Sequence, residues 1–205
     1  MLQDYFDQLK CSERTSSALY DHETVVKKSE LFAFHPVVQE LHGYVLDDEN
    51  TSNHHLLITA GPLAGSVFFL SHDDDSRVVF ENTADFLDAV GKAETEGLSV
   101  TDLHPRLSPV AKDQIALAKF IRELLSRECN DLVVCLLPSL DLADLSLLQL
   151  LANDDDFFLG EAVAMEIEKR PSKVLLPVAA ICADHRHPQI SIPGLRAVRS
   201  IQRLP

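Results

Sequence analysis

Three short runs of branched and aromatic residues, close together in the first half of the chain, constrain the fold more than any other feature. They span residues 55–59, 67–70 and 77–80. Turn-forming residues fill both gaps, with glycine and proline at 61–65 and serine and aspartate at 72–76. β-Branched and aromatic side chains favour strands, and gaps this short join antiparallel neighbours. The pattern predicts an antiparallel meander.

Helical signals flank this predicted sheet. Apolar residues recur every three to four positions over residues 2–9, which indicates a short amphipathic helix. A proline can open a second helix over residues 36–43, and a capping residue and a glycine can bound a third over residues 82–91. The polar stretch 10–30 has little periodicity, so we expect it to be irregular, with one turn of helix at most.

Most of the second half of the chain has the pattern of helices. Residues 91–109 combine glycine, proline, serine, threonine and charge without periodicity, which is typical of a domain boundary. Ser108 and Pro109 form a common helix opening. The apolar run 132–137 is short enough to be a buried strand instead. Helices are predicted over about 110–125, 141–152, 157–169, 172–184 and 194–204.

Two segments of this half resemble each other. GEAVAMEI begins at Gly160 and GLRAVRSI begins at Gly194, 34 residues later, and both share glycine and isoleucine at matching places. This period suits paired-helix repeats, and a plain helical bundle is the alternative. The predicted fold class is therefore α+β: a small antiparallel sheet with flanking helices over residues 1–97, followed by an all-α domain of HEAT-like repeats or a bundle over residues 104–205.

The acidic charge is concentrated in the first half of the chain. Residues 1–100 carry 6 Lys and Arg against 18 Asp and Glu, a net charge of −12, and residues 101–205 carry 12 against 14, a net charge of −2. Such a field repels phosphate backbones and anionic membranes and speeds encounter with a basic partner. We therefore expect neither nucleic acid nor a membrane as partner. The alternative is an acidic surface that only aids solubility.

The composition favours a cytoplasmic protein without a cofactor. The polar start MLQDYFDQLK does not resemble a signal peptide, and no apolar run approaches the roughly 20 residues of a membrane span. Walker A, GxGxxG and GxSxG motifs are absent from the sequence. The cysteines form no CxxC pair, so we expect reduced thiols. They are Cys11, Cys129, Cys135 and Cys182.

The stretch VFFLSHDDDSRVVF, residues 67–80, is the main candidate for chemistry. Consecutive aspartates suit the loop of a hairpin, but imidazole and carboxylate groups are also ligands of divalent metals. Against a metal site, adjacent His54 and His55 would point to opposite faces of a strand, and no HExxH spacing is present. We favour a connector without metal and keep a metal-dependent hydrolase as the alternative. Its ligands would be His54, His55, His72, Asp73 and Asp75.

The stretch LAGSVFFLSHDDDSRVVFENTADFLDAV, residues 63–90, resembles the SUKH superfamily, which includes the yeast cell-wall assembly regulators of the Smi/Knr type. Members share a glycine-containing loop, a strand, an aspartate-rich hairpin turn, another strand and a closing helix with a Phe-Leu pair. The resemblance covers roughly residues 31–91. The Leu-Pro pair that leads into the first helix of members is not found in residues 1–43, and the helical second half lies outside the usual domain of the family.

The resemblance implies a non-enzymatic binding domain, because many bacterial members are regarded as immunity proteins that occupy toxins and others as scaffolds. An acidic domain fits an inhibitor that binds a basic toxin by charge complementarity. We expect a protein partner, with a basic toxin as the leading candidate. The expected partner-binding surface consists of Asp47, Asp48, Glu49, Asp73, Asp74 and Asp75.

Overall fold

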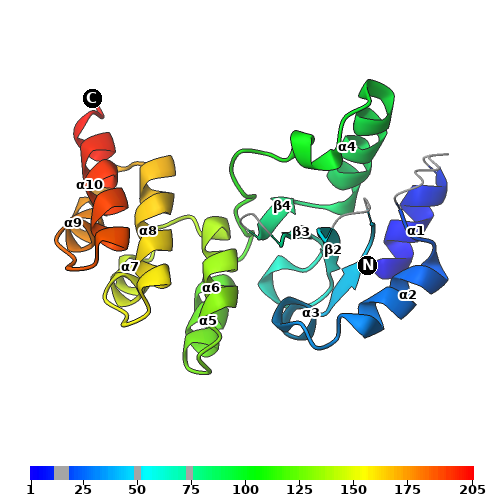
Figure 1. Cartoon of the computed structure of the whole chain (residues 1–205), viewed down its shortest axis with the longest axis horizontal. Coiled ribbons are helices and arrows are strands. Elements are labelled where there is room, and N and C mark those ends of the chain that lie inside the picture. The colour runs from blue at the N-terminus through cyan, green and yellow to red at the C-terminus, as the bar shows by residue number, and fades with distance from the viewer. Residues whose placement is uncertain (12–18, 49–51, 73–75) are drawn as a thin grey trace. The chain divides into compact units, whose positions relative to one another are not determined.

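The computed structural model describes residues 1–11, 19–48, 52–72 and 76–205 (Figure 1). The chain divides into two compact units, residues 1–113 and residues 114–205. Each unit has its own buried apolar residues. The predicted class, an α+β fold followed by helices, is confirmed.

An antiparallel sheet forms the centre of the first unit (Figure 1). Each strand pairs with the next in chain order, so the predicted meander is confirmed, with one additional strand at its start. The outer edge of the first strand has a partner outside the sheet, because the N–H of Val45 donates to the hydroxyl of Ser29 at 2.9 Å. The strands are β1 (Gly43–Val45), β2 (His54–Ile58), β3 (Val67–Leu70) and β4 (Arg77–Phe80).

In the part of this unit that the structure describes, the sheet is flanked by helices α1 (Leu2–Cys11), α2 (His22–Leu31), α3 (Pro36–Leu41) and α4 (Thr83–Glu96). The core joins α1 and α4 to the sheet through their aromatic and aliphatic side chains. The amphipathic helix at the start of the chain and the helix opened by proline are confirmed. The largest members of this core are Tyr5, Phe6, Phe69, Phe80 and Phe86.

Two helices of this unit differ from the prediction. Helix α2 lies where we expected irregular chain: Asp21 caps it by accepting the N–H of Thr24 at 2.8 Å, but only Val25 and Ser29 are buried, so it shows no apolar stripe. Helix α4 was expected to end near residue 91. It continues to Glu96 and is followed by Gly97, whose φ of 69° suits glycine at a helix C-terminus.

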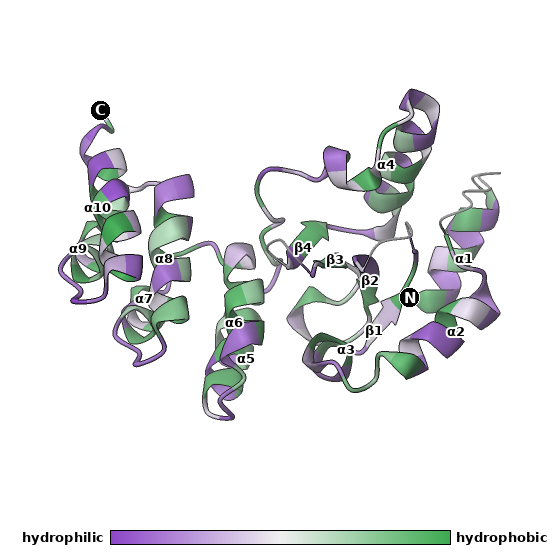
Figure 2. Cartoon of the chain, in the orientation of Figure 1, coloured by the Kyte–Doolittle hydropathy of each residue, from purple (hydrophilic) through white to green (hydrophobic). Residues whose placement is uncertain are grey.

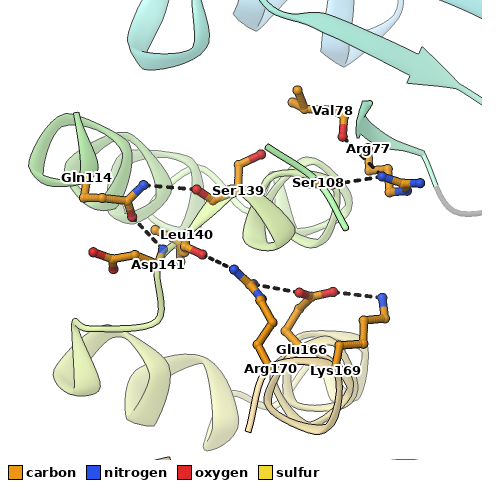
Figure 3. A network of polar contacts seen from close by, with 10 residues as sticks. All are labelled: Arg77, Val78, Ser108, Gln114, Ser139, Leu140, Asp141, Glu166, Lys169 and Arg170. Atoms are coloured by element: carbon orange, nitrogen blue, oxygen red, sulfur yellow. Dashed lines mark hydrogen bonds and ion pairs between the residues drawn. The ribbon is translucent and has the colours of Figure 1, made fainter. Parts of the chain in front are cut away.

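Residues 99–113 belong to the first unit and do not open the long helix that Ser108 and Pro109 predicted. The guanidinium of Arg77 donates to the carbonyl of Pro105 at 2.6 Å, and also to the hydroxyl of Ser108 at 3.3 Å (Figure 3). Lys112 lies 3.1 Å from Glu81. Helix α5 therefore begins only at Gln114, and the boundary between units follows residue 113, later than the interval 97–104 expected from composition.

The second unit contains consecutive helix pairs: α5 (Gln114–Leu125) with α6 (Asn130–Leu136), α7 (Leu145–Ala152) with α8 (Phe157–Lys169), and α9 (Leu176–Ala183) with α10 (Pro188–Gln202). Helix α6 contacts α8, α8 contacts α10, and α7 contacts α9 (Figure 1). The pairs thus stack in chain order, which is the arrangement of paired-helix repeats.

The structure corrects the prediction at α6 and at the start of α10. The run 132–137, which was compatible with a strand, belongs mostly to α6. Every residue in it is apolar, so the sequence shows no period, although Val134 and Cys135 are less buried than the rest. Helix α10 begins at Pro188, six residues earlier than expected, and it includes Pro193. Pro188 suits the first helical position, because the N–H that proline lacks would have no partner within the helix there.

The connector between α6 and α7 is held from two sides (Figure 3). The side chain of Gln114 accepts the N–H of Asp141 at 2.8 Å. From the other side, Arg170 donates to the carbonyl of Leu140 at 2.6 Å and to the buried carboxylate of Glu166 at 2.7 Å.

Within the described ranges, no helix is long and apolar enough to cross a bilayer.

Candidate functional site

Asp47 follows the end of β1 and is buried, with 1% of its surface exposed. Its Oδ1 accepts the backbone N–H of His55 at 2.7 Å, and its Oδ2 lies 2.5 Å from His55 Nδ1. The prediction that Asp47 belongs to an exposed partner-binding surface is therefore wrong. The carboxylate is used inside the unit, where it satisfies two donors of β2.

The polar chain continues from His55 to the segment that follows α4. His55 Nε2 lies 2.8 Å from His104 Nε2, so the two rings share one hydrogen bond and one proton. Phe69 and Phe80 contact both imidazoles. We name these three residues the Asp47–His55–His104 chain. It connects β2 to residues 99–113.

His104 occupies the outer end of this chain and is half-buried. Burial, with repulsion from His55 and Arg77 when the ring is protonated, lowers the pKa of His104 from its ordinary 6.5 to about 3. The ring also borders a cavity of about 410 Å³. An imidazole backed by a carboxylate can accept a proton from a bound molecule. Here the Nε2 atom is occupied by His55, so the interaction shown by the structure is an anchor for the segment.

The lowered pKa of His104 predicts acid sensitivity. Between pH 6.5 and pH 3 the unfolded chain binds a proton at this ring that the folded chain does not, so the free energy of unfolding should fall as the pH falls through this window. The slope approaches about 1.4 kcal/mol per pH unit below pH 6.5, where the unfolded ring is mostly protonated. Solvent screening of a half-buried ring reduces the pKa shift and so narrows this window without changing the slope inside it. Urea denaturation of the full chain at pH 7, 6 and 5 measures the slope.

The control for this prediction is His104→Gln, whose amide can either donate to or accept from His55 but does not titrate. The variant should lose less stability than the wild type between pH 7 and pH 5. Plots of the free energy of unfolding against pH for the two proteins should therefore converge as the pH falls. Parallel curves would show that His104 is not the group responsible.

The other expected binding residues are only partly described. Asp48 is half-buried and accepts the hydroxyl of Tyr20 at 3.1 Å. Burial, together with this bond to Asp48, raises the pKa of Tyr20 to about 12. Glu49, Asp73, Asp74 and Asp75 lie outside the described residues, so their place on a binding surface stays a prediction.

The alternative metal site also depends on residues outside the described ranges. His54 contacts Phe32, whereas His55 lies among the phenylalanines of the core, so the two rings are on opposite faces of β2 as predicted. In residues 1–11, 19–48, 52–72 and 76–205, no three histidine, cysteine, aspartate or glutamate side chains are placed to hold a metal ion. A site that includes Asp73 and Asp75 stays a prediction.

A groove of about 590 Å³ lies between α4, the end of β4 and residues 103–109, and we name it the α4 groove. Sequence reasoning missed it because residues 103–109 had the composition of a linker. The available signal was Asp85 and Asp88, one turn apart on the polar side of α4. Its lining residues are Val79, Phe80, Glu81, Asp85, Asp88, Ala89, Lys92, Leu103, Pro105, Leu107, Ser108 and Pro109.

The wall of this groove formed by residues 103–109 is tied to the sheet at several points. His104 bonds to His55, and Arg77 bonds to Pro105 and Ser108. The described interactions therefore form the groove without a bound partner.

Comparison with models of protein families, with curated proteins and with solved structures finds no match for this chain.

Proposed function

We propose that this chain is a non-enzymatic protein-binding module of the immunity or scaffolding type, whose first unit presents an acidic surface to a basic protein partner. The observation that carries the proposal is the exposure of carboxylates along α1 and α4. Hydrophilic and hydrophobic stretches alternate along both helices (Figure 2), as expected for helices with one buried face. The exposed carboxylates are Asp4, Asp7, Asp85, Asp88, Glu94 and Glu96.

The charge of the first unit supports the same proposal. Residues 1–113 carry 8 Lys and Arg against 20 Asp and Glu, a net charge of −12 out of −14 for the whole chain. A field of one sign steers a partner of the opposite sign and raises its association rate more than its affinity. The resemblance of residues 63–90 to the SUKH superfamily is a second support, and a basic toxin is the partner class that it implies.

The test is an association-rate measurement with paired charge reversals. A partner is first captured with the full chain and identified. The variant Asp88→Lys with Glu94→Lys should then slow association with that partner at least about tenfold at low salt, while the melting temperature stays nearly unchanged. The effect should shrink in 0.5 M salt, since charges farther apart than a few ångströms are then screened.

The matched control is Glu23→Lys with Glu30→Lys on α2, which makes the same change in net charge on another helix of the same unit. It should slow association only about threefold, through the long-range field. Equal rates for the wild type and the α4 variant would reject the proposal for this surface. Equal reductions of the association rate in the two variants would mean that the net charge of the unit, and not the α4 surface, determines the rate.

A further inference from the structure

We propose that the α4 groove anchors the partner and that its occupant is an arginine or lysine side chain from a basic protein segment with apolar neighbours. This inference rests on the proposed function and names the place and the chemistry of the contact. The groove has a volume of about 590 Å³, which lies within the usual range of pockets that hold a small ligand. One long side chain with its flanking residues fits that size.

The floor of the groove is apolar. Val79 and Phe80 are buried at its base, and Ala89 and Leu103 are half-buried beside them. Leu107 is 41% exposed, so part of its side chain is available to an occupant. The methylene stem of an arginine or lysine covers such a surface while its charged end reaches polar groups.

The charged groups of the groove are predominantly acidic. Three carboxylates and one lysine line it, and the carboxylates of Asp85 and Asp88 lie along the exposed side of α4. Lys112 pairs with Glu81 at 3.1 Å. Asp85 accepts the side-chain amide of Asn82 at 3.0 Å. With three carboxylates against one lysine, the lining of the groove still carries a net negative charge. An occupant that combines an aliphatic stem with a cationic end matches the apolar floor and the carboxylates of the α4 wall together.

The opposite wall is stiff. Pro105 and Pro109 restrict the backbone of residues 103–109. The bonds from Arg77 to Pro105 and Ser108, with the contact between His55 and His104, hold this wall in place. A groove that is formed before binding loses less entropy when it is occupied, so it suits an anchor residue.

The experiment uses the full chain labelled with ¹⁵N and three acetylated tetrapeptide amides as probes. The sequence Leu-Arg-Leu-Arg supplies both features, Gly-Arg-Gly-Arg supplies charge alone, and Leu-citrulline-Leu-citrulline supplies apolar surface alone. The first should shift the backbone amide signals of residues 79–92 and 103–109. The other two should bind at least about tenfold more weakly, since each lacks one half of the recognition.

A pair of protein variants locates the site. Leu107→Lys places a cation in the groove and should weaken Leu-Arg-Leu-Arg binding at least about tenfold. Its control is Leu98→Lys, because Leu98 has nearly the same exposure, 44% against 41%, and is not part of the groove lining. This control should bind like the wild type.

Three outcomes would each contradict binding in the α4 groove. They are binding of Gly-Arg-Gly-Arg as tight as that of Leu-Arg-Leu-Arg, signal shifts confined to α1, and wild-type affinity of Leu107→Lys for Leu-Arg-Leu-Arg. Each leaves the proposed function in place, because that is decided by the association rate of the captured partner. If the probe occupies the groove while reversal of charge on α4 leaves the captured partner's rate unchanged, the groove stands as a cation site and the proposed docking surface fails.

Discussion

Replacing Asp47 with alanine is expected to lower the free energy of unfolding of the first unit by about 3–5 kcal/mol, the cost of breaking a buried ion-pair-type contact by removing one partner. The backbone N–H and the Nδ1 atom of His55 would both lose their acceptor. Both groups are buried, so water cannot replace the carboxylate without entering the core. The contact between His55 and His104 would lose the group that orients it.

Tyrosine fluorescence measures this loss in the intact chain. All three tyrosines, Tyr5, Tyr20 and Tyr44, lie in the first unit and the chain has no tryptophan, so the urea transition followed by tyrosine reports that unit alone. Asp48→Ala is the matched control. It removes the same charge from the next residue, but Asp48 is only half-buried, and we expect a loss of about 1 kcal/mol. Similar losses in both variants would contradict a special role for Asp47.

The sheet was predictable because its signal is local. Each of the runs 55–59, 67–70 and 77–80 shows its strand character within a few residues, and the gaps between them are short enough to define the pairing. The opposite orientations of His54 and His55 follow from the same two-residue period. Strand β1 is only three residues long and gave too little pattern to recognise.

The polar site was not predictable, because its members meet only after folding. His55 and His104 are 49 positions apart, and Asp47 opens a stretch rich in aspartate, asparagine, threonine and serine that is typical of exposed loops. Nothing in that composition distinguishes the buried Asp47 from its neighbour Asp48. The same limit hid the α4 groove, since residues 103–109 have linker composition and become a wall only through their bonds to Arg77 and His55.

The repeated glycines of the second unit were only partly predictable from the sequence. The sequence shows Gly160 and Gly194 at matching places 34 residues apart, but not why glycine is needed. In the structure each is a point of close approach between helices. A Cβ at Gly160 would lie 2.8 Å from the Cδ1 atom of Ile190, and a Cβ at Gly194 would lie 2.5 Å from the backbone nitrogen of Ala183.

Gly194→Ala is therefore expected to destabilise the second unit by about 2–3 kcal/mol, the usual cost of forcing extra volume into a packed interior. Helix propensity alone predicts the opposite sign, because alanine is better than glycine in a helix interior by up to about 1 kcal/mol. The obstacle is backbone: the new methyl would meet the nitrogen of Ala183 at 2.5 Å and the carbonyl carbon of Cys182 at 2.6 Å. Helices α9 and α10 would have to move apart, so hydrogen exchange should accelerate in both.

Gly160→Ala is the matched control, since it makes the same change in α8 at the other end of the 34-residue spacing. Its new methyl would meet only side-chain atoms of Ile190 and no backbone, so the helices need not separate as far, and we expect a smaller loss of about 1 kcal/mol. Hydrogen exchange measured by mass spectrometry on peptides from residues 176–202 distinguishes the two variants in the full chain. A Gly194→Ala protein with wild-type or slower exchange in that region would show that α9 and α10 do not depend on this close contact.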